Sequence, residues 1–347
     1  MNERYQLTPT PIECPACRGR EGLLLYTVDA ATAAQHYVLH EVHPERHRAL
    51  EAHIATLWGQ PACDLVRCAR CGLVSADPYV AGDARFYDLA YERTGYPAWK
   101  WEFAQTRDAL QRLRSEGALG DFTLLELGAG DGAFVRRIAP ELIPPSHVLC
   151  TEYSPYGRDA IERLGVACRM QDVRALPLDE FAGRFDVICL FQVLEHLDRL
   201  DALFERFGQL STPAGQVFIA VPNDARVTFN ETHGSLLDMP PNHIGRWTRP
   251  AFEAIAGRHG WRVEAHAVEP ERRRAQVARY ITYRYMRKRQ DSGAWANRIE
   301  RIRPAPLRRG AQAAAAALYA LGAWRQIAAL VQTPGLGDSQ WVHLRKA

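Results

Sequence analysis

The chain has 347 residues, of which 47% are hydrophobic and 24% charged, with a formal net charge of +3. Such a composition is typical of a globular protein, and the small net charge gives the whole molecule no strong attraction for polyanions. The N-terminus lacks the basic patch and apolar core of a signal peptide, and no run reaches the ~18 apolar residues that span a bilayer, so we expect a cytoplasmic protein.

Two C-x-x-C pairs lie near the N-terminus, Cys14 with Cys17 and Cys68 with Cys71. Cysteines of a cytoplasmic protein are expected to be reduced thiols or metal ligands. Four thiolates in two such pairs suit tetrahedral zinc, and a shell made only of thiolates leaves no open position, so the metal would be structural. The alternative is a set of redox or buried thiols, since the insert between the pairs, 18–67, is longer than a compact zinc ribbon uses. We expect the histidines of this insert to be solvated helix residues rather than ligands.

Composition divides the chain into four segments. They are an N-terminal module with the cysteine pairs (1–85), a core that alternates apolar runs with helical patterns (86–270), an arginine- and alanine-rich insert (271–335) and a final strand (336–347). The core opens with an aromatic stretch, residues 86–103. This stretch either packs between the N-terminal module and the core or closes over a bound ligand. We expect at least one of its aromatic residues to touch ligand, among them Tyr87, Tyr91, Tyr96 and Trp99.

The core is predicted to contain a parallel β-sheet. The predicted strands are 122–127, 147–153, 185–191, 215–221, 261–268 and, more weakly, 166–170. Helix starts are indicated at Ser154, Asp198 and Thr248. Nearly all-apolar strands separated by helices imply a doubly wound α/β fold, with helices on both faces of the sheet.

The stretch FTLLELGAGDGAF places Gly128, Gly130 and Gly132 directly after the first strand of the core. Glycine lets the backbone approach a ligand closely, and parallel sheets bind ligands at the carboxyl ends of their strands. The spacing fits a nicotinamide dinucleotide as well as an adenosyl ligand. Glu126 favours the adenosyl ligand, because a carboxylate there would repel a pyrophosphate and attract the ammonium group of a methionine moiety.

Three later motifs follow the next strands. Glu152 ends the second strand, Asp172 follows the third within MQDVRALP, and LFQVLEHLDRL (190–200) follows the fourth. With these motifs the chain resembles class I S-adenosylmethionine-dependent methyltransferases, whose signature is E-x-G-x-G-x-G, an acid ending strand two, D-x-x-x-L-P, and V-L-E-H after strand four. LEHL and the later VPN resemble the subgroup that includes small-molecule and sugar methyltransferases. The cysteine pairs resemble the zinc-binding module that precedes some sugar C-methyltransferases.

The resemblance implies a seven-stranded, Rossmann-like core with a small N-terminal zinc-binding module and a helical insert before the last strand. It implies S-adenosylmethionine as the cofactor and structural Zn²⁺ on the four cysteines. The two first glycines would line the methionine part, the acid of strand two would accept from both ribose hydroxyls, and Asp172 would accept from the adenine amine unless it is only a helix cap. The implied cofactor-binding residues are Glu126, Gly128, Gly130, Glu152, Asp172, Val173 and, beside the sulfonium, Gln192.

Methyl transfer needs mainly alignment of the acceptor with the methyl group, and a base where the acceptor atom carries a proton. The candidate catalytic residues are Glu195, His196 and His243, with His233 less favoured. His196 lies beside the cofactor by its motif position and is either a base or a residue that fixes the turn. His243 lies in the long loop 222–247 over the carboxyl edge of the sheet, where related enzymes place an active-site histidine, and is either a base or a loop-stabilising residue.

The insert carries a local charge that the whole chain does not. Residues 271–310 hold 13 Arg or Lys and 3 Asp or Glu, which is a net charge of +10. The first part is predicted to be a cationic amphipathic helix that is solvated, or that contacts anionic lipid, nucleic acid or a phosphorylated acceptor through 272–309. The apolar run 311–331 is predicted to be a helix that docks on the core, on a second subunit or on a membrane surface.

We therefore expect a methyltransferase that acts on a small-molecule acceptor by in-line displacement with a histidine base. The resemblance alone favours a sugar or glycan precursor, and the methylated atom and the oligomeric state stay open. One alternative is an RNA methyltransferase that uses the basic insert, but the chain has no Asn-Pro-Pro-Tyr-like amino-methylation motif. Another is a non-catalytic nucleotide-binding module, against which the intact Glu126, Glu152 and Asp172 argue.

Overall fold

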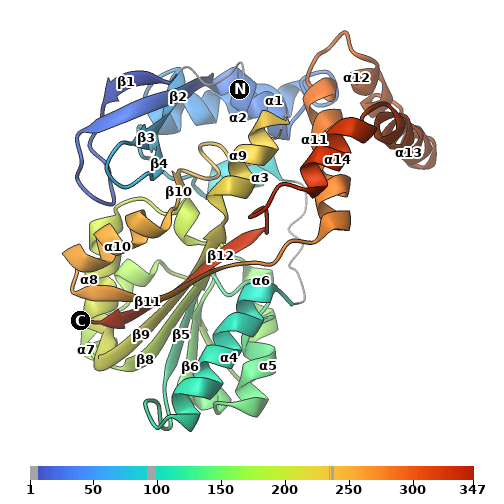
Figure 1. The fold of residues 1–347 in the computed structure, drawn as a ribbon. Coiled ribbons are helices and arrows are strands. Elements are labelled where there is room, and N and C mark those ends of the chain that lie inside the picture. The colour runs from blue at the N-terminus through green and yellow to red at the C-terminus, as the bar shows by residue number, and fades with distance from the viewer. Residues whose placement is uncertain (1–6, 92–98, 234, 236–237) are drawn as a thin grey trace.

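The computed structural model describes residues 7–91, 99–233, 235 and 238–347. Two β-sheets organise these residues, one of seven strands and one of five. Figure 1 shows the larger sheet in the lower half of the molecule, the smaller sheet at the upper left and the C-terminal helices at the upper right.

The larger sheet is the doubly wound α/β core that the sequence predicts. Its strand order is β11-β12-β9-β8-β5-β6-β7, and only β12 runs antiparallel to its neighbours. The strands are β5 (Leu124–Leu127), β6 (Val148–Thr151), β7 (Ala167–Arg169), β8 (Phe185–Phe191), β9 (Ser211–Pro222), β11 (Trp261–Val268) and β12 (Ser339–Lys346). All seven predicted strands are confirmed, including the final one that follows the insert.

Helices cover both faces of this sheet. One face carries α7 (Leu178–Phe181), α8 (Leu200–Leu210) and α10 (Arg249–Arg258), and the other α4 (Trp101–Ser115), α5 (Val135–Glu141) and α6 (Pro155–Glu162). Along β8, Ile188 and Leu190 pack in the first layer while Val187 and Cys189 pack in the second. Because both faces of the strand are buried, its sequence is an unbroken apolar run.

The predicted helix starts are confirmed at two of three positions. Ser154 and Thr248 each cap a helix with a hydroxyl that accepts a backbone amide at 3.2 Å. The prediction that Asp198 opens a helix is wrong, because α8 begins at Leu200. The Asp198 carboxylate instead accepts a hydrogen bond from the Arg174 guanidinium at 3.3 Å.

The smaller sheet belongs mostly to the N-terminal segment and is antiparallel, in the order β1-β2-β3-β4-β10. Its strands are β1 (Thr8–Pro11), β2 (Glu21–Asp29), β3 (Ala62–Cys68), β4 (Val74–Asp77) and β10 (Gly245–Arg246). The helices that pack with it are α1 (Ala30–Tyr37), α2 (Pro44–Trp58) and α3 (Ala84–Ala90). Since β10 comes from the long segment after β9, that segment ties the two sheets together.

Two histidines of the N-terminal insert are buried, which contradicts the expectation that these histidines are solvated. His36 is 2% exposed and His47 6% exposed. The Nδ1 atom of His36 lies 3.0 Å from the Gln290 side chain, and the Nδ1 atom of His47 lies 2.8 Å from the Val38 carbonyl oxygen. Both rings therefore hold packed segments together, whereas His40 is exposed as expected.

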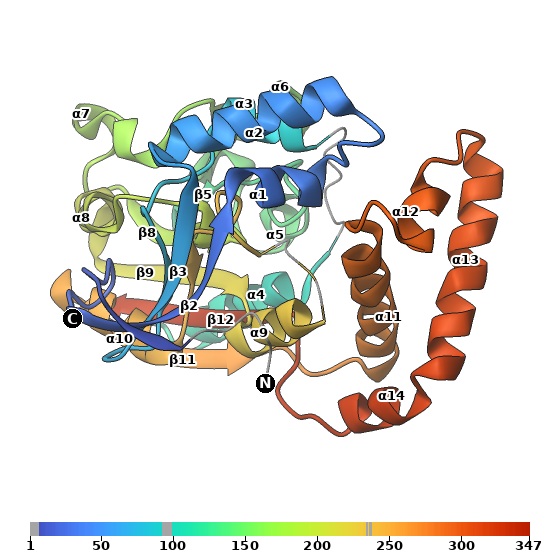
Figure 2. The ribbon, with the colours of Figure 1, turned by 90° about the horizontal axis from the view of Figure 1, so that it is seen from above.

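The basic insert folds into helices that project beside the core (Figure 2). They are α11 (Arg273–Arg289), α12 (Trp295–Glu300), α13 (Ala305–Gly322) and α14 (Trp324–Val331). The predicted cationic helix is α11, and the predicted apolar helix is divided between α13 and α14. In the described part of the chain no single helix is long and apolar enough to cross a membrane, and α13 and α14 reach that size only as a pair bent by 78°.

Candidate functional site

The glycine turn after β5 has the backbone geometry that the sequence predicts. Gly128, Gly130 and Gly132 have φ angles of 61°, 59° and 77°, a region that L side chains rarely adopt. A Cβ atom at position 128 would lie 2.7 Å from a side-chain methyl of Val193. The turn is therefore restricted to glycine by both conformation and space, and it exposes bare backbone at the carboxyl end of β5.

Glu152 holds this turn to the start of the next helix. Its Oε2 accepts the Gly130 amide at 2.9 Å, and its Oε1 accepts the Ser154 amide at 2.9 Å. Burial raises the pKa of Glu152, and the amide hydrogen bonds partly offset that rise. Each carboxylate oxygen has a further lone pair, so Glu152 can still accept from ligand hydroxyls.

Glu126 is a buried carboxylate that needs a cation. It is 2% exposed, and within the described residues its Oε2 has no hydrogen-bond partner. Burial, with smaller contributions from Glu152 and Asp131, raises the pKa of Glu126 well above its ordinary value. Because an unpaired buried carboxylate is costly, the ammonium group of the methionine moiety fits this position. The orphaned oxygen and the glycine turn are the two observations that fit an S-adenosylmethionine site.

Asp172 is engaged by a neighbouring arginine. It precedes the short helix η2 (Val173–Ala175), and its oxygens accept from the Arg174 guanidinium at 2.8 and 2.6 Å. Burial alone would raise the pKa of Asp172, but the hydrogen bonds from Arg174 outweigh burial and lower it. Asp172 is thus a helix cap, the alternative that the sequence left open, and contact with adenine requires its remaining lone pairs. The side chain of Val173 is buried beside it.

Gln192 links the end of β8 to two other elements. Its Nε2 donates to the Glu102 carboxylate at 3.2 Å and to the Ser339 hydroxyl at 3.1 Å. Its φ of 58° turns the chain sharply, so that Val193 packs against the glycine turn. Gln192 is therefore placed at the predicted strand end, with its amide nitrogen already paired.

The three candidate catalytic side chains come together. Glu195 and His196 lie in the short helix η3 (Leu194–His196), and His243 comes from the segment before β10. The rings of His196 and His243 meet edge to face with centroids 4.6 Å apart. One ligand atom from each of the three side chains lies within 4.8 Å of the others, so the group can transfer protons or hold a cation.

The partner of His243 is Asp238, which the sequence analysis missed. Its Oδ1 lies 3.0 Å from the His243 Nδ1, and Asp238 is 1% exposed. Burial would raise the pKa of Asp238, but the positive charge of Arg226 and the contact with His243 outweigh it and lower the pKa. An ionised Asp238 fixes the proton of His243 on Nδ1 and leaves Nε2 with a free lone pair.

His196 is held as a neutral imidazole. Its Nδ1 lies 2.6 Å from the Asn242 carbonyl oxygen, which only accepts, so Nδ1 carries the proton. The Tyr87 hydroxyl lies 2.9 Å from the same nitrogen. Burial, followed by the nearby His243, lowers the pKa of His196 to about 3.

Glu195 is the most isolated acid of the group. It is 1% exposed, and neither carboxylate oxygen has a hydrogen-bond partner among the described residues. Burial raises the pKa of Glu195 to about 7. Near neutral pH this side chain is therefore poised between its protonated and ionised forms.

The remaining predicted residues lie outside this group. His233 packs between Phe229 and Tyr280, with ring centroids 4.1 and 4.8 Å away, and has a packing role. In the aromatic stretch, Trp99 packs against the core, with its ring centroid 5.6 Å from that of Phe103. Tyr96 lies outside the described residues.

The four cysteines form a compact, buried knuckle. The sulfur atoms of Cys14 and Cys71 are 3.6 Å apart, those of Cys17 and Cys68 are 3.5 Å apart, and all four sulfurs lie within 4.8 Å of one another. Zinc–sulfur bonds of about 2.3 Å in a tetrahedron place sulfurs about 3.8 Å apart, so the thiols fit a zinc ion. Cys63 is not part of this group. The knuckle packs into the same hydrophobic cluster as α8 and α10.

Several solved methyltransferase structures are similar to the chain at low identity. A SAM dependent methyltransferase from Archaeoglobus fulgidus is 15% identical, with 71% of this chain and 96% of that chain covered and a TM-score of 0.42. Magnesium protoporphyrin IX methyltransferase from Synechocystis PCC 6803 is 12% identical, with 73% and 90% covered and a TM-score of 0.42. Geranyl diphosphate C-methyltransferase from Streptomyces coelicolor A3(2) is 11% identical, with 70% and 76% covered and a TM-score of 0.39. No curated protein matches the sequence.

A family match covers the part of the chain that holds the site. Residues 98–266 match the model of a family described as methyltransferase domain. This range begins just before α4 and ends within β11, and it includes the glycine turn and all three candidate catalytic residues. Residues 98–266 therefore match a methyltransferase domain on a core with the class I methyltransferase fold, which supports an S-adenosylmethionine-dependent methyltransferase.

Proposed function

We propose that the chain methylates a small-molecule acceptor and that His243 is the general base. The bound cofactor supplies an activated methyl group on a sulfonium centre, so the tasks of the chain are to align the acceptor and to remove its proton. The observation that carries the proposal is the pair of Asp238 and His243, 3.0 Å apart and next to His196. A buried acid behind a histidine is the arrangement that makes an imidazole an oriented base.

The hydrogen bond between Asp238 and His243 determines which nitrogen of His243 takes the proton of the acceptor. Asp238 accepts from the Nδ1–H of His243, so the Nε2 of His243 takes the proton of the acceptor. The ionised Asp238 then stabilises the imidazolium that forms. His196 stays neutral at physiological pH because its pKa is lowered to about 3, so it adds no positive charge beside the base.

Different residues of the site would hold the two ends of the bound cofactor. Glu126 takes the ammonium group, because its buried oxygen is otherwise without a partner. The bare backbone at Gly128 and Gly130 lies along the methionine part, and Glu152 accepts from the ribose hydroxyls with the lone pairs that the two amides leave. The adenine amine is assigned to Asp172. Its hydrogen bonds with Arg174 leave it fewer lone pairs with which to accept from the adenine amine.

We propose a sugar or glycan precursor as the acceptor. The support is the resemblance of LEHL, VPN and the cysteine pairs to sugar methyltransferases, rather than a contact in the structure. The RNA alternative has no such support, because it rests on the positive charge of the insert alone.

We also propose that the cysteine knuckle binds structural Zn²⁺. Its four thiols are buried, their spacing is close to that of a tetrahedral thiolate shell, and no position stays open for a substrate. The knuckle is fastened to the core by the Thr248 hydroxyl, which donates to the Cys71 carbonyl at 2.6 Å, and by Arg258, which donates to the Ala16 carbonyl at 2.8 Å. Zinc would thus stabilise the face of the sheet that carries α8 and α10.

The test is a methyl-transfer assay with a panel of free and nucleotide-linked deoxysugars, and an RNA oligonucleotide as a further acceptor. His243→Ala is expected to lower kcat by about 10²- to 10⁴-fold, the usual contribution of a general base, while the Kd for S-adenosylhomocysteine changes less than about twofold. Asp238→Asn should also lower kcat, because it removes the charge that orients His243. His40→Ala, at an exposed position, is the control. Equal loss of turnover and cofactor affinity in His243→Ala would refute the base role.

A further inference from the structure

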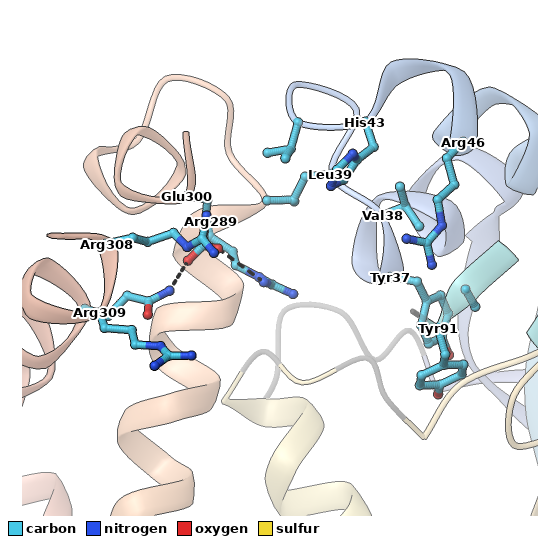
Figure 3. A pocket seen from close by; sticks show the side chains of 13 residues that line it. Tyr37, Val38, Leu39, His43, Arg46, Tyr91, Arg289, Glu300, Arg308 and Arg309 are labelled. Carbon is cyan, nitrogen blue, oxygen red and sulfur yellow. Dashed lines mark hydrogen bonds and ion pairs between the residues drawn. The ribbon is translucent and has the colours of Figure 1, made fainter. Parts of the chain in front are cut away.

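A pocket separates the N-terminal helices from the basic insert (Figure 3). Its volume is about 530 Å³, and its two walls come from α1–α3 and from α11–α13. The cations in its lining are Arg46 on the N-terminal wall and Arg289, Arg308 and Arg309 on the insert wall. Among the lining residues that the structure describes, the one carboxylate is Glu300. Arg46 already contacts other groups, among them the Leu89 carbonyl oxygen, so the excess positive charge of the described lining comes from the insert wall.

The single acid does not neutralise this charge. Glu300 lies 3.9 Å from the Arg289 guanidinium and also accepts from the side chains of Tyr285 and Gln312. In the described part of the chain, no carboxylate pairs with Arg308 or Arg309. Two arginines on adjacent positions of α13 are therefore available to an anion.

Unsatisfied donors line the same pocket on both walls. The Tyr37 hydroxyl and the Nε of Arg289 are buried and have no hydrogen-bond partner within the described residues. A buried donor without a partner costs about 1–3 kcal/mol, so an anionic acceptor that reached either donor would stabilise the folded chain. The two residues that carry these donors line the cavity, one on each wall.

An aromatic wall connects this pocket to the catalytic candidates. Tyr91 lines the pocket and stacks on Tyr87, with ring centroids 6.2 Å apart. The Tyr87 ring in turn meets the His196 ring at 6.1 Å, and its hydroxyl lies 2.9 Å from the His196 Nδ1. Two ring contacts therefore lead from the cationic pocket to the histidine pair.

We propose that this pocket binds the phosphate or diphosphate group of the acceptor, so that the acceptor's reactive end extends along Tyr91 and Tyr87 toward His243. The guanidinium fork matches phosphate oxygens in two-point hydrogen bonds, which is why arginine is favoured over lysine at such sites. The pocket lies between two walls and has a volume of about 530 Å³, which suits a small molecule better than a membrane or an RNA strand. The identity of this ligand as acceptor rests on the proposed function, whereas the anion site itself does not.

The experiment is isothermal titration of the full-length chain with inorganic pyrophosphate and, separately, inorganic phosphate, at low and physiological salt. The wild-type chain is expected to bind pyrophosphate more tightly than phosphate, and Arg308→Ala with Arg309→Ala to weaken pyrophosphate binding at least tenfold. Arg274→Ala removes one charge near the other end of α11, roughly 22 Å along the helix from Arg289, and is expected to leave binding unchanged. Arg309→Glu, at an exposed position, repeats the test without removing a packed side chain.

Absence of binding in the wild-type chain, or equal affinity in wild type and in both pocket variants, would overturn the proposal. Stronger, arginine-dependent binding to phosphatidylglycerol vesicles or to RNA, with none to pyrophosphate, would overturn it as well. S-adenosylhomocysteine affinity is measured in the same variants and is expected to be unchanged. If pyrophosphate binds and S-adenosylhomocysteine does not, the methyltransferase function fails while the anion site stands; the reverse result removes only the anion site.

Discussion

The isolated carboxyl group of Glu195 gives a prediction for how stability depends on pH. Burial raises its pKa to about 7 from an ordinary value of 4.5. Between these pH values the folded chain keeps a proton that the unfolded chain has released, so the free energy of unfolding falls as pH rises through this window. A pKa difference of about 2.5 corresponds to about 3 kcal/mol in the free energy of unfolding. This contribution to stability is fully lost above pH 7.

Glu195→Gln keeps the shape of the side chain and stays neutral at every pH. We expect the variant to match the wild-type chain near pH 4.5 and to be about 3 kcal/mol more stable at pH 8, where the wild-type chain must bury a charge or take up a proton. Urea unfolding at several pH values, followed by tryptophan fluorescence, measures the difference. Glu253→Gln, at an exposed carboxyl, is the control and should show no such trend.

A stability difference between Glu195→Gln and wild type that does not change from pH 4.5 to pH 8 would refute the reasoning. Such a result would mean that a cation or a hydrogen-bond donor pairs with Glu195 in solution and offsets the cost of burying its charge.

Three further predictions follow from the site and its supports. Gly128→Ala should weaken S-adenosylhomocysteine binding at least tenfold in a titration, because the positive φ at position 128 and the nearby methyl of Val193 exclude a Cβ atom. Gly120→Ala is the control and should leave binding unchanged, because position 120 has open space for a Cβ atom. The purified chain should contain one zinc per molecule by mass spectrometry, and Cys68→Ala should lose it together with thermal stability; a second zinc that disappears on substitution of the histidine pair would contradict the base role. Glu231→Gln should lower the free energy of unfolding in urea by about 3–5 kcal/mol, because it weakens the buried pair that joins Glu231 to Arg246 at 2.5 Å; a change below about 1 kcal/mol would contradict this.

Features set by local sequence were predictable. The strands of the core are apolar runs of the right length, and the caps at Ser154 and Thr248 need only a side chain and an amide three residues on. The glycine turn was recognisable for the same reason, since positive φ at Gly128 is a property of that residue and its neighbours.

Features that depend on distant contacts were not predictable from the same patterns. Asp198 has the composition of a helix cap, but Arg174 binds it from another part of the chain. His36 is buried because Gln290 of the insert packs on it across more than 250 residues of sequence. Asp238 stands five residues before His243, yet that spacing alone does not show that the two side chains meet. The pairing depends on how the segment before β10 folds back against the N-terminal sheet.

The most direct measurement is calorimetric titration of the purified chain with S-adenosylhomocysteine, in parallel with Glu126→Gln. The account predicts one bound molecule per chain and at least tenfold weaker binding to the variant, because the substitution removes the negative charge that faces the ammonium group. An absence of heat with the wild-type chain, or equal affinity in wild type and variant, would contradict it.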